Sequence, residues 1–294
     1  MNFRTDLAIE CKEEYGESEI EGVKYTEKYN ETSKTTIIEV LNKKGEFAIG
    51  KPVGNYITVE VPNFSSDGEI LDDRLTAIKE ELARLIPNDG VILVVGLGND
   101  NITPDALGPR TIDKIIATRH ISAELAKSVG LEGLRMVSAL APGVLGQTGI
   151  ETGEIIMGVS KSVKPSAVIT VDALASRRLS RLGCTVQIAD TGVTPGSGVG
   201  NARAQINEQT LGVPVIAVGV PTVVDAATLA NDLLGDNEED KDLFSKLDGQ
   251  GANMIVTPRE IDLMIDRAAK LLALAINSAL QPTLTAEDIM AMTS

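Results

Sequence analysis

The distribution of apolar residues changes along the chain and divides it into two kinds of predicted structure. Up to about residue 65 the sequence is polar, and apolar and polar residues alternate over 35–41 and 56–61. Such alternation is typical of antiparallel strands with one face in water. From Val91 onward, continuous apolar runs alternate with helical patterns, which indicates buried parallel strands joined by helices.

The elements after the polar segment predict the fold class. Buried strands are expected at Val91–Val95, Ala167–Val171, Thr185–Ala189 and Val213–Val220. Helices are expected over 71–86, from Pro104 to about Ser128, over 151–160, and from the capping sequence Thr257–Glu260 to about Leu280. Alternating strands and helices imply βαβ units with right-handed crossovers. We therefore predict one elaborated α/β domain, with a mainly parallel sheet flanked by helices and an N-terminal β-rich segment.

Composition narrows the classes of function. The chain has 294 residues and a formal net charge of −15, which argues against a surface that binds nucleic acid. No apolar run approaches the roughly 20 residues needed to span a membrane, and the N-terminus lacks a signal-peptide core. We expect a cytosolic protein. Two distant cysteines and a single histidine suggest neither a disulfide framework nor a zinc site.

The most informative stretch lies between Val91 and Pro109. Its apolar run ends in Gly96-Leu97-Gly98, and a helix start follows at Thr103-Pro104. Asp105 then falls in the first turn, at the carboxyl edge of the predicted sheet. Open α/β folds bind their ligands at this edge, so the sequence predicts an active site there.

A second acid, Asp172, directly follows the predicted strand Ala167–Val171. Neighbouring parallel strands lie about 4.8 Å apart, so Asp105 and Asp172 would share one crevice if their strands adjoin. Two close carboxylates resist joint ionisation, which lets one activate a water while the other protonates a carbonyl oxygen. The alternative, that both are surface acids capping a helix or loop, is equally open from these two residues alone.

Glycine-rich loops near the same edge supply backbone amides for a developing oxyanion. The candidates are Gly96, Gly98, Asn99, Gly196, Ser197 and Gly198. Dinucleotide binding is disfavoured because Asn101 replaces the third glycine of GxGxxG, and we expect no cofactor. A serine elbow is absent because position 195 is proline.

Charged residues around the two acids have several open roles. Arg177 and Arg178 are the best nearby cations, either to hold an aspartate ionised, to grip a substrate carboxylate or to pair on the surface. Arg110 and Arg203 have the same options. On a continuous helix His120 would lie roughly 22 Å from Asp105, so it could not share a metal with that residue.

The two acids and their glycine loops together resemble the germination protease family of spore-forming bacteria. The resemblance runs from Arg4 to the C-terminal helix and rests on these segments: Gly96–Asn99, Thr103–Pro109, Val137–Leu140, Gly149–Thr152, Asp172–Ala175, Asp190–Gly192, Pro195–Asn201 and Gly219–Asp225. A more distant likeness, through Gly-x-Gly-Asn and the two acids, is to hydrogenase maturation proteases.

The resemblance implies a function and two catalytic residues. It implies a homotetrameric endopeptidase of the spore core that starts the degradation of small acid-soluble spore proteins during germination. The catalytic aspartates of the family match Asp105 and Asp172.

The resemblance also implies a precursor that processes itself. Family substrates are cut after an acid in Thr-Glu-(Phe/Ile)-Ala-Ser-Glu-like sequences, and this chain carries a similar segment, Arg4–Glu10. By analogy self-cleavage falls between Asp6 and Leu7, which makes residues 1–6 a propeptide and residues 7–294 the peptidase domain. The chain departs from the family where the region from Asp225 to Thr257 is short and acidic.

Two alternatives remain from the residues themselves. A metal-dependent peptidase could use the same carboxylates, with an all-oxygen site that suits a hard cation. A non-catalytic binding protein could grip peptides or nucleotides with the glycine loops, and it would tolerate Asp→Asn changes. We expect water attack assisted by Asp105 and Asp172, with no resident metal and no acyl-enzyme.

Overall fold

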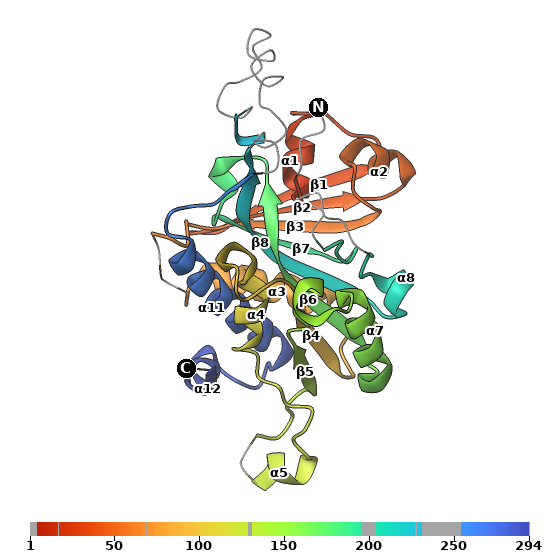
Figure 1. Cartoon of the computed structure of the whole chain (residues 1–294), viewed down its shortest axis with the longest axis vertical. Coiled ribbons are helices and arrows are strands. Elements are labelled where there is room, and N and C mark those ends of the chain that lie inside the picture. Colours follow the sequence, from red (N-terminus) through yellow and green to blue (C-terminus); the bar gives the residue numbers. More distant parts are fainter. Residues whose placement is uncertain are drawn as a thin grey trace.

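One mixed sheet runs through the molecule and carries helices on both faces (Figure 1). The computed structural model describes residues 5–16, 18–66, 68, 70–128, 131–195, 204–226, 228–230 and 254–293. Within these residues the sheet has nine strands in the order β1-β2-β3-β7-β8-β6-β4-β5, with β9 beside β8. Their bounds are β1 Val23–Tyr29, β2 Lys34–Val40, β3 Gly54–Glu60, β4 Ile92–Gly96, β5 Val137–Leu140, β6 Ala167–Ser176, β7 Thr185–Ala189, β8 Val215–Asp225 and β9 Ile255–Val256.

The strands that were predicted from apolar runs form the centre of the sheet. Strands β5, β4, β6 and β8 are parallel neighbours, and β7 joins β8 in the antiparallel sense. The alternating N-terminal segments form β2 and β3, which pair antiparallel with each other, with β1 and with β7. The predicted α/β class, with parallel strands in the core and an N-terminal antiparallel part, is confirmed.

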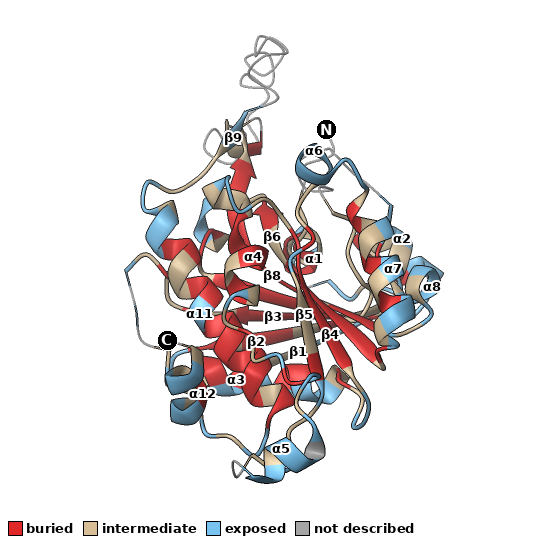
Figure 2. Ribbon diagram, turned by 60° about the horizontal axis from the view of Figure 1, so that its bottom comes forward, coloured by how far each residue is buried: buried red, intermediate tan, exposed pale blue. Residues whose placement is uncertain are grey.

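Helices divide between the two faces of the sheet, as Figure 2 shows. Apolar side chains of α3, α4 and α11 pack on one face, and those of α1, α2 and α7 pack on the other. The helical bounds are α1 Ala8–Glu13, α2 Lys43–Ile49, α3 Asp73–Leu85, α4 Leu107–Ile112, α5 Ala123–Ser128, α6 Leu145–Thr148, α7 Thr152–Val163, α8 Glu208–Leu211, α11 Ile261–Leu280 and α12 Ala286–Thr293, with 3₁₀ turns η1 Thr103–Asp105 and η2 Leu179–Arg181.

The single helix predicted from Pro104 to about Ser128 is wrong. The chain forms η1 and α4, leaves the helix after Ile112, and becomes helical again only in α5. The side-chain amide of Asn277 on α11 binds the backbone on both sides here, accepting from the Ile116 N–H and donating to the Lys114 carbonyl. Tertiary contacts therefore outweigh the local helical pattern.

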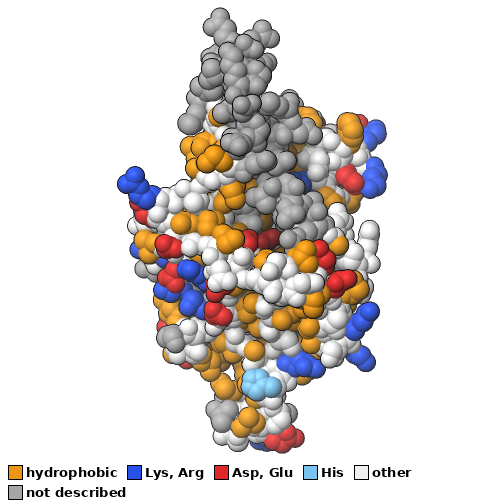
Figure 3. Space-filling view, viewed as in Figure 1, with side chains coloured by type: hydrophobic (Ala, Val, Ile, Leu, Met, Phe, Trp, Pro, Cys, Tyr) orange, Lys and Arg blue, Asp and Glu red, His pale blue; other side chains and the backbone are white. Residues whose placement is uncertain are grey.

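The expectations for His120 and for the start of the last long helix also change. His120 lies in an exposed turn rather than on a continuous helix, so the distance inferred from helical rise does not apply. In Figure 3 the histidine surface lies toward the end of the molecule that carries α5. The Thr257 capping box is also wrong, because α11 begins at Ile261 without a side-chain cap and the Thr257 hydroxyl donates to the Thr222 carbonyl.

No helix among the described residues is long and apolar enough to cross a membrane.

Candidate active site

Asp105 is held by the loop that follows β4. The backbone N–H of Asn99 donates to Asp105 Oδ2 at 2.7 Å. Gly98 makes this loop possible, because its φ is +112° and a Cβ there would lie 2.0 Å from the Asp105 carbonyl oxygen. The Thr222 hydroxyl fixes the same turn from β8 by donating to the Pro104 carbonyl at 2.8 Å. The geometry directs the Asp105 carboxylate back toward the end of β4.

Asp172 lies at the same edge, on the neighbouring strand. Strands β4 and β6 pair in parallel with Gly96 opposite Val171, so Asp172 is the first residue of β6 beyond the end of β4. The connections that leave β4 and enter β6 run on opposite faces, through α4 and α7. This is the switch point at which open α/β sheets form ligand crevices. Strands β4 and β6 adjoin, which was the condition for the two acids to share one crevice.

The charge of Asp105 affects the protonation of Asp172. Burial raises the pKa of Asp172 well above its ordinary value, and the negative charge of Asp105 raises it further. The charge of Asp6 adds a third, smaller contribution in the same direction. One hydrogen bond, from the Ala173 N–H to Asp172 Oδ1 at 2.9 Å, opposes these effects. Asp172 therefore keeps a proton to higher pH than an ordinary aspartate does.

The N-terminal segment returns to this site. The Asp6 N–H donates to the Ala175 carbonyl of β6, and the Ala175 N–H donates to Asp6 Oδ2, each at 2.9 Å. On the other side, Gln187 of β7 donates to the Asp6 carbonyl at 3.0 Å and accepts from the Ala8 N–H at 2.9 Å. Leu7, between them, is fully buried. Asp6, the first of the two residues predicted to flank self-cleavage, is thus bound to β6 near enough for its charge to act on Asp172.

Glu10 anchors the same segment a turn later. Its buried carboxylate accepts from the backbone N–H groups of Arg177 and Arg178, each at 2.8 Å. The arginine side chains, which the sequence offered as ligands for a carboxylate, form ion pairs with Glu14 and Glu13 of the N-terminal region. The peptide backbone at 177–178, rather than the guanidinium groups, therefore binds an acid.

The remaining predicted site residues are placed as follows. Gly96 ends β4 and is buried, and the Asn99 N–H is occupied by Asp105. The Asn99 side chain accepts from Gln147 Nε2 at 2.7 Å. Arg110 lies 3.9 Å from Asp100. Outside the described residues are Gly196, Ser197, Gly198 and Arg203.

Comparisons with known proteins point to one family. The germination protease family model matches residues 4–236. A germination protease of Caldanaerobacter subterraneus is 47% identical, covering 98% of this chain and 97% of the relative. One from Clostridium perfringens is 44% identical with 98% coverage of both, and one from Priestia megaterium is 35% identical over 99% and 97%.

The chain belongs to the germination protease family. It is thus a peptidase of spore germination, a hydrolase of peptide bonds. Among solved structures, a [NiFe] hydrogenase maturation protease from Thermococcus kodakarensis matches with a TM-score of 0.37 and 18% identity, covering 67% of this chain and 98% of the other. That likeness is too weak to say more about the chain.

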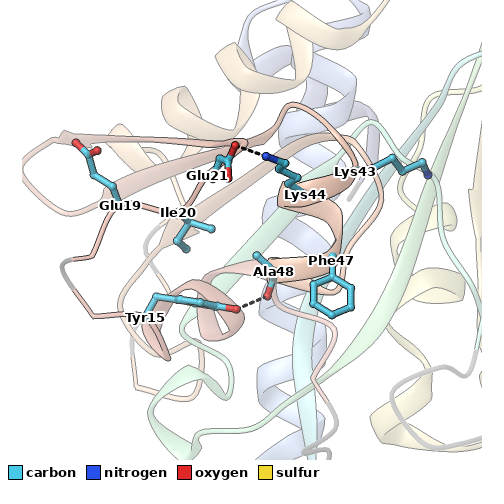
Figure 4. A pocket seen from close by; sticks show the side chains of 8 residues that line it. All are labelled: Tyr15, Glu19, Ile20, Glu21, Lys43, Lys44, Phe47 and Ala48. Atoms are coloured by element: carbon cyan, nitrogen blue, oxygen red, sulfur yellow. Dashed lines mark hydrogen bonds and ion pairs between the residues drawn. The ribbon is translucent and has the colours of Figure 1, made fainter.

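A hollow lies away from the carboxylates, between the end of α1 and α2 (Figure 4). Its polar groups bind one another: the Tyr15 hydroxyl donates to the Ala48 carbonyl at 2.9 Å, and Lys44 pairs with Glu21 at 2.6 Å. Among the described residues, no group of three His, Cys, Asp or Glu side chains is arranged to hold a metal ion.

Sequence reasoning about this family member missed Gln187, which contacts the N-terminal segment. The residue interrupts the buried strand Thr185–Ala189 with a polar side chain that is 7% exposed. A single amide side chain in a strand buried on both faces could have indicated a functional contact, because buried polar groups need hydrogen-bond partners. The partner could not be named, since Asp6 lies 181 residues away along the chain.

Proposed function

We propose that this chain is an endopeptidase that begins the degradation of small acid-soluble spore proteins in the spore core. It cuts after an acidic residue with a water activated by Asp105 and Asp172. It is made as a precursor that cleaves itself between Asp6 and Leu7, and it works as a homotetramer.

One observation carries the proposal: an acid-containing peptide segment lies against a coupled pair of carboxylates. Asp6 is hydrogen-bonded to β6 and β7, and its charge contributes to the raised pKa of Asp172. A peptidase requires this juxtaposition of an extended peptide and an acid–base pair. Surface acids that only cap a helix would not be buried beside a second carboxylate and a peptide backbone.

The two aspartates divide the acid–base work. Asp172 holds the shared proton, because burial and the charge of Asp105 disfavour its ionised form. Asp105, which accepts the Asn99 N–H, is the partner that serves as the base. Asp105 takes a proton from water as the water oxygen attacks the carbonyl carbon. The proton on Asp172 goes to the carbonyl oxygen. As the C–N bond breaks, Asp105 passes the proton that it took from water to the leaving amine, and Asp172 takes back a proton from a hydroxyl of the tetrahedral intermediate.

The contacts of residues 5–10 suggest how a substrate is read. Leu7 and Ala8 are fully buried in an apolar cluster with Leu174 and Tyr56, which suits an apolar and then a small residue after the cut. The acid of Glu10 is held by two backbone N–H groups. This order matches the substrate-like sequence that the family resemblance implies. A substrate needs the same place, so residues 7–10 must leave it before the trimmed enzyme turns over.

The test uses the chain trimmed to begin at Leu7 and a peptide containing Thr-Glu-Ile-Ala-Ser-Glu, in excess chelator. Asp105→Asn and Asp172→Asn variants serve as controls, because they keep the shape of the side chains and remove the acid–base chemistry. We expect the wild type, and neither variant, to cleave the peptide after the first Glu. Mass spectrometry of the products measures this cleavage.

Other outcomes separate the alternatives. Activity that disappears with chelator and returns with one metal would favour the metal-dependent peptidase. Tight binding of the peptide without cleavage, unaffected by both Asp→Asn changes, would favour a binding protein. Cleavage by Asp172→Asn at the wild-type rate would contradict the assigned chemistry.

A further inference from the structure

Gln187 lies across the sheet from Asp172 and contacts the same N-terminal segment. Residues Asp172, Gly219 and Gln187 are register partners across β6, β8 and β7. Register partners point to the same face of a sheet, so Asp172 and Gln187 flank Gly219 on one face. Their backbones are about 10 Å apart, two strand spacings.

Gly219 has no side chain, and Leu174 of β6 packs into the space beside it. A Cβ at this position would lie 2.6 Å from both the Asp172 carbonyl oxygen and Leu174 Cγ. The Asp6 residue bridges β6 and β7, because its N–H binds Ala175 on β6 while its carbonyl binds Gln187 on β7. The peptide backbone thus spans from Ala175, three residues beyond Asp172 on β6, to Gln187 on β7.

The amide orientation of Gln187 is fixed by its two partners. Its oxygen must face the Ala8 N–H, which only donates, and its nitrogen must face the Asp6 carbonyl, which only accepts. The nitrogen therefore donates at 3.0 Å to the carbonyl of residue 6, and the oxygen holds the peptide two residues later. At 7% exposure, this donor acts in a place largely closed to water.

We propose that Gln187 is a catalytic residue that stabilises the oxyanion formed on the carbonyl of the residue before the cut. The inference rests on the proposed function, in which the bond between Asp6 and Leu7 is the self-cleavage site. When water oxygen bonds to the Asp6 carbonyl carbon, the π electrons move to the carbonyl oxygen. The Gln187 N–H then strengthens its hydrogen bond to that oxygen as negative charge develops there, and the proton from Asp172 neutralises the charge. When the C–N bond breaks, the oxygen returns this proton to Asp172 and the carbonyl re-forms.

The role predicts a particular kinetic signature. Removal of a donor that acts on the developing charge lowers kcat. Removal of a group that only holds the peptide raises KM instead. Loss of one such donor costs about 10²–10³-fold in kcat. Gln187→Met removes both hydrogen bonds at similar volume. Gln187→Glu keeps the acceptor for the Ala8 N–H and, when ionised, has no proton to donate.

The experiment measures kcat and KM of the trimmed chain on the Thr-Glu-Ile-Ala-Ser-Glu peptide, and the first-order rate of self-cleavage in the full chain. Wild type and Asp172→Asn are run beside both Gln187 variants and Gln209→Met, a matched change at an exposed position of α8. We expect kcat and the self-cleavage rate to fall in both Gln187 variants, with KM changed only a few-fold and Gln209→Met equal to wild type.

The failures are distinguishable. If Asp172→Asn cleaves as fast as wild type, or wild type does not cleave at all, the proposed function fails and this role fails with it. If wild type cleaves, Asp172→Asn does not, and Gln187→Glu retains the wild-type kcat, only the role of Gln187 is overturned. A rise in KM with unchanged kcat would make Gln187 a binding group and would also overturn it. Thermal unfolding of each variant checks that the fold is kept.

Discussion

Under the proposed function, Asp172 is a side chain that serves catalysis at the expense of stability. Its carboxyl is placed beside Asp105 and Asp6, where ionisation is opposed by burial and by two negative charges. The unfolded chain ionises this group at its ordinary pKa of about 3.9. Above that pH the folded chain holds a proton that the unfolded chain has lost, so raising the pH favours unfolding. The sign follows from a pKa that folding raises.

Asp172→Asn should therefore remove both the activity and this pH dependence. We expect the melting temperature of the variant to exceed that of wild type by a margin that grows as the pH rises from about 5 toward the raised pKa of Asp172. While the folded chain keeps the proton, the slope from this one group approaches about 1.4 kcal/mol per pH unit. Scanning calorimetry across this range measures the margin.

A matched change at Asp113, an exposed carboxylate at the end of α4, provides the control. Asp113→Asn should follow the wild-type profile. A difference between Asp172→Asn and wild type that stays constant with pH would contradict the assignment of the raised pKa to Asp172.

The short helix α1 acts as an anchor for the segment that precedes it. Ala8 and Ile9 of this helix, with Leu7 just before it, join an apolar cluster with β2, β3 and β6. Its Glu10 carboxylate accepts hydrogen bonds from two backbone N–H groups. A helix of six residues has little stability of its own, so these contacts hold it in place. Its docking sets the position of Asp6 beside Asp172.

Glu10→Ala should loosen this anchor. The Arg177 and Arg178 N–H groups would lose their acceptor, which we expect to lower the free energy of unfolding by roughly 1–3 kcal/mol and to slow self-cleavage. Glu10→Gln keeps one acceptor oxygen and should lie between. Urea unfolding and the mass of the N-terminal fragment provide the two measurements.

Glu21→Ala is the comparison for this change, because Glu21 is 75% exposed and pairs with Lys44 on the surface. Exposed pairs contribute little, so this variant should stay within about 1 kcal/mol of wild type. Equal effects of the Glu10→Ala and Glu21→Ala changes on both measurements would show that Glu10 does not anchor the segment.

The same elements show what could be predicted from the sequence. Strands β4 and β6 are continuous apolar runs with an acid just after each, so the meeting of Asp105 and Asp172 at one edge followed from parallel pairing. The course of the chain after Ile112 could not be predicted from the sequence, because Asn277 of α11 replaces helical hydrogen bonds there. Local periodicity carries no information on a partner 161 residues away.

The contacts of the N-terminal segment were predicted only in part, because its partners also lie far away along the chain. The sequence located the segment Arg4–Glu10 through its resemblance to family substrates, but its contacts with Ala175, Gln187 and the 177–178 backbone span 167 to 181 residues. Such pairings depend on the register of β6, β8 and β7, which is set by the whole sheet.

Under the proposed function, the chemistry depends on the whole fold. Asp6, Asp105, Asp172 and Gln187 come together only when β4, β6, β8 and β7 are paired and α1 is docked. Because the segment lies in the site of its own chain, its effective concentration there far exceeds that of any second molecule. Self-cleavage should therefore be intramolecular.

Two measurements on the full chain test this. The first-order rate constant of self-cleavage should be the same across a wide range of protein concentrations. A full-length Asp172→Asn chain, which keeps its own residue 6 in its own site, should stay uncut when mixed with active trimmed enzyme. The peptide substrate added to the same mixture shows that the trimmed enzyme is working.

A rate that rises with concentration, or cutting of the Asp172→Asn chain by the trimmed enzyme at the rate of wild-type self-cleavage, would show that chains process one another. The contacts of Asp6 with Ala175 and Gln187 would then have to open before the bond is cut. Weakening the anchor through Glu10→Ala separates the two routes further, because it should slow cleavage within a chain and speed cleavage between chains.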